Sequence, residues 1–184
     1  PNSVLARSLL VSAHISHAWD ARGSDYANSV SKEQWRVYHE RIDEAVREFR
    51  SAEEQHGRCH KFYEAAIELA RAQSWKKEDS DKYFDEAIKF DPAYQYFYTA
   101  KAIELMPRWG GRPGEWEKFA SDVRESIGGA AGLQMYYLIV AEVADLNVDG
   151  SPEVYVYVRS NGADEKGSVV AYVANNRKSL STAS

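Results

Sequence analysis

The chain has 184 residues, of which 44% are hydrophobic and 28% charged, and its formal net charge is −5. This balance is typical of a soluble globular protein with one ordinary domain, or one domain plus a fragment. The acidic charge argues against a nucleic-acid-binding surface, which needs a basic patch. The 5 Trp and 12 Tyr exclude a disordered chain. No apolar run approaches the ~20 residues of a membrane-spanning helix.

Neither the single cysteine nor the first residues of the sequence indicate the cellular compartment of the protein. Cys59 is the one cysteine, so it forms no internal disulfide and does not report the redox compartment. No basic segment followed by an apolar segment opens the sequence, so we expect no export signal in it.

The first two helices are predicted over residues 3–18 and from residue 31 onward, with a loop at 19–30 between them. Ser31 is followed three residues later by Gln34, which is a capping box, and Val30 and Trp35 stand at the positions of a hydrophobic staple. The second helix then carries an amphipathic stripe at steps of three and four: Trp35, Tyr38, Ile42, Ala45 and Phe49.

Further helices are predicted over residues 60–74, 80–90, 93–106 and 116–127, with 131–141 as an extension of the set. Asp91-Pro92 is a stop-and-restart signal, because Asp caps a helix and Pro suits its first position. Gly128-Gly129 closes the helix that starts near Trp116.

The helical part contains an internal repeat. The pattern of residues 62–69 returns 36 residues later at 98–105, and that of 83–90 returns 33 residues later at 116–123. Paired helices at this period are typical of a tetratricopeptide-like array, in which each pair buries its apolar face against its neighbours. A plain helical bundle with chance periodicity is the alternative.

After residue 141 the apolar period changes to two. The runs 154–158 and 169–173 are rich in Val and Tyr and flank a polar, Gly-containing turn, which predicts a short antiparallel β-hairpin, or a meander if 140–146 adds a strand. The fold class is therefore mainly α, with a helical domain at 1–139 and an incomplete β segment at 140–184. So few strands are marginal alone, and they must pack on the helices, pair with a partner or belong to a larger domain.

Two resemblances follow from local motifs. The segments His17–Gly23, Asp85–Tyr94 and Met106–Trp116 resemble, in that order, a bacterial family of unknown function with a tetratricopeptide-like fold. This likeness covers residues 10–140 and implies a fold without an activity. The segment from Val143 to Tyr172 resembles the periplasmic inhibitors of lysozyme, which are β-sandwich proteins, in a truncated form. The first likeness implies a cytoplasmic protein and the second a periplasmic one.

The most specific chemical pattern lies at the junction of the two parts. Asp145, Asn147 and Asp149 stand at positions 1, 3 and 5 of a calcium loop, and Glu153 at position 9 supplies a further oxygen. It is not an EF-hand, since position 12 is Val156 and a strand follows. The alternative is a polar hairpin turn, which prefers the same residue types.

Two short segments are candidate binding sites. Trp19, Asp20 and Arg22 share the first predicted loop, where Arg22 suits a carboxylate. Arg108 and Trp109 lie in a Pro- and Gly-rich turn. For both segments the alternative is a packed corner without a ligand.

No catalytic signature is visible: there is no phosphate-binding loop, nucleophile elbow or carboxylate pair that can be placed. We therefore expect a non-enzymatic scaffold that binds a peptide or protein in an aromatic groove of a helical repeat. The alternative is a calcium-stabilised β inhibitor or recognition module of a bacterial envelope protein.

Overall fold

The computed structural model describes residues 3–24, 27–143, 153–159, 167–175 and 179–182, with side chains as far as Val143. The chain is mainly helical, as expected, and its contacts group into two compact units, Pro1–Glu104 and Leu105–Ser184. The domain boundary expected at 139/140 falls inside a helix of the second unit and stays a prediction. In the described part of the chain, no helix is long and apolar enough to cross a membrane.

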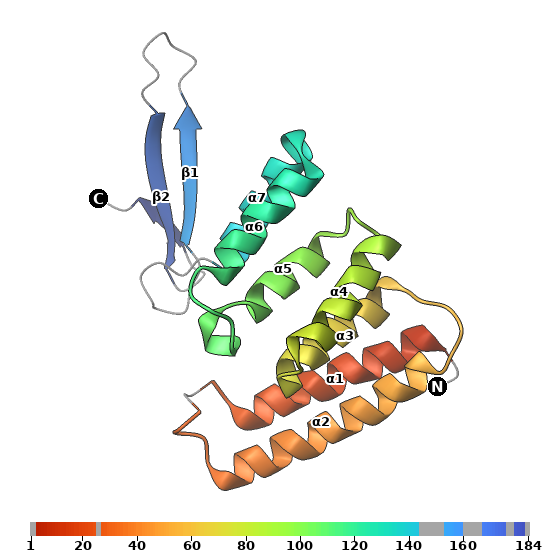
Figure 1. Cartoon of the computed structure of the whole chain (residues 1–184). Helices are drawn as coiled ribbons and strands as arrows, with labels where there is room; N and C mark the ends of the chain where they lie inside the picture. Colours follow the sequence, from red (N-terminus) through yellow and green to blue (C-terminus); the bar gives the residue numbers. More distant parts are fainter. Residues whose placement is uncertain (1–2, 25–26, 144–152, 160–166, 176–178, 183–184) are drawn as a thin grey trace. The chain divides into compact units, whose positions relative to one another are not determined.

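The described residues of the first unit form the helices α1 to α5 (Figure 1). They are α1 (Val4–Arg22), α2 (Lys32–Glu53), α3 (His60–Gln73), α4 (Lys77–Phe90) and α5 (Gln95–Glu104). Helices α1 and α2 lie side by side over most of their length, α3 contacts both of them, and α4 and α5 pack on α3. Helix α3 therefore lies next to both α1 and α5, although α2 and α4 separate these helices in the sequence.

Local signals explain where the first two helices begin and end. The capping box is present: the Ser31 hydroxyl accepts from the Gln34 amide, and the Gln34 side chain accepts from the Ser31 amide. The loop expected at 19–30 is wrong for residues 19–22, because α1 continues through Arg22. It ends at Gly23, whose φ of 79° suits glycine and whose amide bonds the Trp19 carbonyl.

The core of the first unit is apolar and aromatic. Among its largest fully buried side chains are Val11, Phe62, Leu69 and Phe97. The Phe62 ring stacks on that of Phe49, with centroids 5.2 Å apart, and so joins α3 to α2. Burying each such side chain contributes about 1.5–3 kcal/mol.

One charged side chain is buried among these helices. Lys101 of α5 is 2% exposed, and its ammonium lies 2.8 Å from an Asp81 carboxylate oxygen and 3.1 Å from one of Glu104. It also donates to the Ser80 hydroxyl at 2.8 Å, and that hydroxyl donates to Glu104. All three ammonium protons therefore have acceptors, which offsets the desolvation of the charge.

Replacing Lys101 with Ala should destabilise the first unit by about 3 kcal/mol, since it leaves Ser80 and two carboxylates without their cation in a largely buried place. Because Asp81 is partly exposed, the expected loss in the free energy of unfolding is at the low end of the range for buried ion pairs that lose one partner. Urea unfolding followed by circular dichroism measures the loss. The matched change Arg36→Ala removes two exposed ion pairs within α2, with Glu33 and Glu40, and should leave the midpoint nearly unchanged. Equal midpoint shifts for the two variants would contradict a special role of Lys101.

The second unit begins with the 3-10 turn η1 (Pro107–Trp109), followed by α6 (Glu115–Ile127) and α7 (Gly129–Val143). The two helices pack closely at Gly132, where an added Cβ would come within 2.3 Å of the Arg124 carbonyl oxygen. Residues 140–143 belong to α7 rather than to a strand. The burial of Met135, Ile139 and Val143 at steps of four fits a helix.

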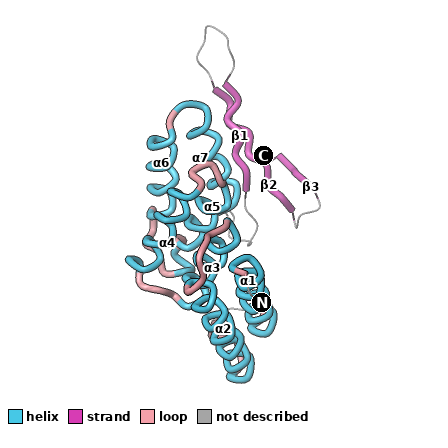
Figure 2. Tube along the Cα trace, turned by 90° about the vertical axis from the view of Figure 1, so that its right-hand side faces the viewer, coloured by secondary structure: helices cyan, strands magenta, loops and turns pink. Residues whose placement is uncertain are grey.

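Three strands follow α7: β1 (Glu153–Arg159), β2 (Gly167–Asn175) and β3 (Ser179–Thr182). They form an antiparallel sheet in the order β1-β2-β3 (Figure 2). Glu153 pairs with Val173 and Arg159 with Gly167 in the first ladder, and Tyr172 pairs with Thr182 in the second.

Candidate functional site

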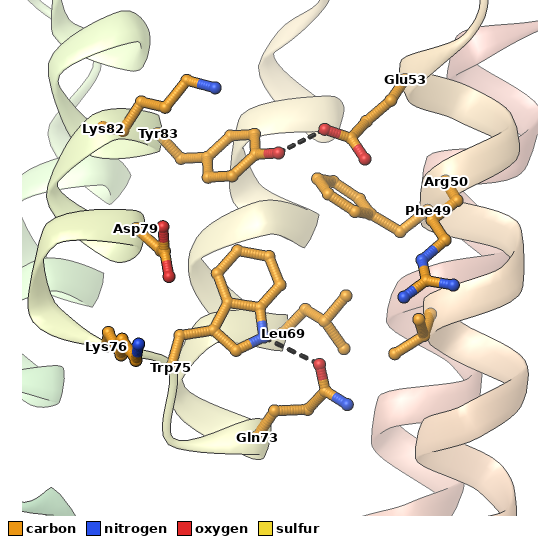
Figure 3. Close-up of a pocket in the computed structure, with 11 residues that line it drawn as sticks. Phe49, Arg50, Glu53, Leu69, Gln73, Trp75, Lys76, Asp79, Lys82 and Tyr83 are labelled. Atoms are coloured by element: carbon orange, nitrogen blue, oxygen red, sulfur yellow. Dashed lines mark hydrogen bonds between the residues drawn. The ribbon is translucent and has the colours of Figure 1, made fainter.

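The candidate site is an open hollow of about 370 Å³ between α2, the end of α3 and the start of α4 (Figure 3). We call it the aromatic hollow. Its lining comprises Val46, Phe49, Arg50 and Glu53 of α2, Leu69 and Gln73 of α3, Trp75 and Lys76 of the following turn, and Asp79, Lys82 and Tyr83 of α4.

The turn after α3 places Trp75 in the hollow. Ser74 takes a left-handed conformation with φ of 51°, and the Trp75 amide donates back to the Ala70 carbonyl at 2.9 Å. This geometry reverses the chain directly after the last helical turn. The Trp75 indole Nε1 donates to the Gln73 side chain at 2.7 Å, which fixes the plane of the ring (Figure 3).

Three aromatic rings form the apolar surface of the hollow. Phe49 is 3% exposed and forms its floor, whereas Trp75 and Tyr83 are half-buried. The Tyr83 ring lies 5.6 Å from Phe49 and 5.5 Å from Trp75, measured between centroids. Edge-to-face and tilted pairs of this kind stabilise one another, so the surface is preformed.

A hydrogen bond orders the wall of the hollow. The Tyr83 hydroxyl donates to a carboxylate oxygen of Glu53, which joins α4 to α2 (Figure 3). Burial raises the pKa of the Tyr83 phenol, and the bond to Glu53 and the charges of Glu53 and Glu86 raise it further. The phenol is therefore a donor throughout the physiological pH range.

Cationic side chains surround the rings. Arg50, Lys76 and Lys82 are all exposed, and none of them forms an ion pair within the described residues. The Lys82 ammonium lies 5.6 Å from the centroid of the Tyr83 ring. With Glu53 and Asp79, the lining carries three positive and two negative side chains, in a chain whose net charge is −5.

Two further tyrosines, Tyr94 directly before α5 and Tyr96 within it, bond to α3. Tyr94 donates to Glu64 at 2.7 Å, and Tyr96 donates to Glu68 at 2.6 Å. Glu68 also accepts from Ser12 of α1, at 2.8 Å. Because these carboxylates already hold hydroxyl donors, this face joins helices and is a poorer ligand site than the aromatic hollow.

The binding candidates of the first segment lie at the end of α1. The Arg22 guanidinium lies over the rings of Trp19 and Trp35, at 5.6 Å and 5.4 Å from their centroids, and the Trp19 ring meets Tyr38 edge-on. The structure therefore brings Trp19 and Arg22 together, while Asp20 is exposed. A stacked guanidinium of this kind fits the packed corner that was the alternative reading.

The second pair of candidates belongs to η1. The exposed Arg108 guanidinium lies 5.9 Å from the centroid of the half-buried Trp109 ring. A role of this pair in binding stays a prediction.

The calcium ligands fall largely beyond the described residues. Asp145, Asn147 and Asp149 lie outside them, and Glu153 is described only as the first residue of β1. In the part that the structure does describe, no group of three or more His, Cys, Asp or Glu side chains could hold a metal ion. The calcium loop stays a prediction.

Comparisons with models of known families, with curated proteins and with solved structures give no match to this chain. The two resemblances stated from motifs therefore stay hypotheses.

The residues of the aromatic hollow were not among those expected from the sequence. Phe49 was predicted only as a member of an apolar helix stripe, and Trp75 fell between the predicted helices 60–74 and 80–90. A tryptophan flanked by Ser74, Lys76 and Lys77 between two helices is the signal that could have drawn attention to the turn.

Spectrophotometric titration at alkaline pH should reveal the buried phenols. The hydrogen bond to Glu64 and burial raise the pKa of Tyr94 to about 12, and burial raises that of Tyr38 to about 12, against about 10 when unfolded. Part of the tyrosines of the folded chain should therefore ionise only near pH 12 or above, whereas those of the urea-unfolded chain should all titrate with a midpoint near pH 10. Because the raised groups keep their protons longer when folded, stability is full below pH 10 and falls as the pH rises toward 12. Identical titration curves for the folded and unfolded chain would contradict these contacts.

Calorimetry tests the predicted calcium loop. If Asp145, Asn147 and Asp149 bind Ca²⁺ in the folded chain, millimolar calcium should raise the melting temperature by mass action. The variant Asp149→Ala should lose the rise, and magnesium should reproduce little of it, since Mg²⁺ dehydrates reluctantly and demands octahedral geometry. An unchanged melting curve up to several millimolar calcium would exclude a functional site.

Proposed function

We propose that this chain is a non-catalytic recognition module: a tetratricopeptide-like helical array that binds a peptide segment of a protein partner. The succession of helices supports an array, because α3 contacts both α1 and α5, and α1 and α3 are each followed by a helix that packs on them, α2 and α4. The repeat of about 34 residues in the sequence is what such stacking requires.

The observation that carries the proposal is the aromatic hollow. Its volume of about 370 Å³ lies at the lower end of the range of ligand pockets and has room for one or two side chains of a peptide. Its lining combines Trp75, Tyr83 and Arg50, the residue types that dominate binding energy in protein interfaces. The rings are fixed by contacts with one another and with Gln73 and Glu53, so little ordering is needed on binding.

Selection of random dodecapeptides displayed on phage against the whole chain tests the proposal. We expect convergent sequences whose affinity falls at least tenfold in Trp75→Ala, about the loss of one interface anchor. The variant should keep the helical circular dichroism of the parent, because Trp75 lies in a turn and is only half-buried.

Arg22→Ala is the matched control, since it removes a half-buried residue from the other candidate surface. Its affinity for the selected peptides should stay within twofold of the parent. Peptides that fail to converge would refute the proposed function, and peptides that depend on Arg22 instead would move the site to the end of α1.

A further inference from the structure

The charges around the aromatic hollow indicate which kind of segment it takes. Arg50 projects from the α2 side, and Lys76 and Lys82 stand on the α4 side, so cations lie on opposite edges of the rings (Figure 3). All three are exposed and free of ion pairs within the described residues. A carboxylate on either side of an apolar anchor would therefore meet a cation without displacing an existing partner.

The same lining disfavours a cationic ligand. Aromatic rings with nearby carboxylates can hold an ammonium group, but here the Lys82 ammonium already lies 5.6 Å from the Tyr83 ring. A second cation at that ring would face a like charge. The Glu53 carboxylate is also engaged by the Tyr83 hydroxyl, which leaves Asp79 as the one lining carboxylate without such a bond.

The acidic net charge of the chain does not override this local pattern. Repulsion from distant carboxylates is screened beyond about 8 Å at physiological ionic strength. The three cations lie on residues that line the hollow itself, so they act on a bound segment at shorter range than most of the remaining charges.

We propose that the aromatic hollow selects an acidic peptide segment: one aromatic or aliphatic side chain seated on Phe49, Trp75 and Tyr83, with flanking carboxylates facing Arg50 and Lys82. This rests on the proposed function and adds the chemistry of the partner to it. The apolar anchor supplies most of the affinity, and the carboxylates supply selectivity and a faster association.

Three fluorescein-labelled octapeptides test the charge preference by fluorescence polarisation: Gly-Asp-Asp-Leu-Phe-Asp-Asp-Gly, and its counterparts with Asn or Lys in place of Asp. With the whole chain, the Asp peptide should bind at least tenfold more tightly than the Asn peptide, and the Lys peptide more weakly still. The advantage should shrink as salt is raised, because exposed charges are screened.

Charge-reversal variants show which residues cause the preference for the Asp peptide. The double variant Arg50→Glu, Lys82→Glu should abolish or invert the preference. The matched double variant Arg47→Glu, Lys89→Glu should retain it, since both residues are exposed on the same two helices and neither lines the hollow. Equal loss in the two double variants would show a general charge effect and overturn the inference.

The outcomes separate this inference from the proposed function. If Asp and Asn peptides bind equally and both are lost in Trp75→Ala, the hollow binds peptides but without acidic selectivity, and only the inference falls. The inference also falls if the Asp peptide shows no binding at concentrations up to about 1 mM, because a dissociation constant above that value is weaker than in most specific peptide recognition. The proposed function falls with it only if the phage-selected peptides are likewise indifferent to Trp75.

Discussion

The contact of Phe49 with Phe62 connects the core of the first unit to the aromatic hollow. Phe62 lies in the buried core, where its contact with Phe49 holds α3 against α2. On its other side Phe49 meets Trp75 and Tyr83 and so forms the floor of the aromatic hollow. Loss of the Phe49 ring would therefore cost packing energy and remove the surface on which a ligand would rest. A site built on a core residue is rigid, because the packing that stabilises the fold also fixes the floor.

Tyrosine hydroxyls bonded to glutamates recur along the first unit. Tyr83 donates to Glu53, Tyr94 to Glu64 and Tyr96 to Glu68, so in each pair a later helix or turn is tied to a preceding helix. A bond between a phenol and a carboxylate is stronger than one between neutral groups. These bonds add directional contacts to the apolar packing between the helices. They also restrain the carboxylates, and so they determine which charges remain open to a partner.

The sequence predicted much of the fold and little of the site, for physical reasons. The capping box at Ser31 and the apolar stripe through Phe49 are local patterns, and α2 follows them. The end of α1 was misplaced because residues 19–22 look like a polar loop, yet Trp19 and Arg22 pack against Trp35 and Tyr38 of α2 and extend the helix. The burial of Lys101 depends on Ser80 and Asp81 of another helix, and no spacing within α5 reveals that.

The surroundings of Trp75 explain why the aromatic hollow was not predicted from the sequence and which of its features suit ligand recognition. Its neighbours in the chain are polar, so its apolar environment comes from Phe49 and Tyr83, far away in sequence. An exposed apolar surface promotes aggregation unless polar groups surround it. Here Arg50, Lys76 and Lys82 surround the rings, and none of the three forms an ion pair with another residue that the structure describes. Under the proposed function, the side chains that surround the rings in the free protein would also select among the segments that bind there.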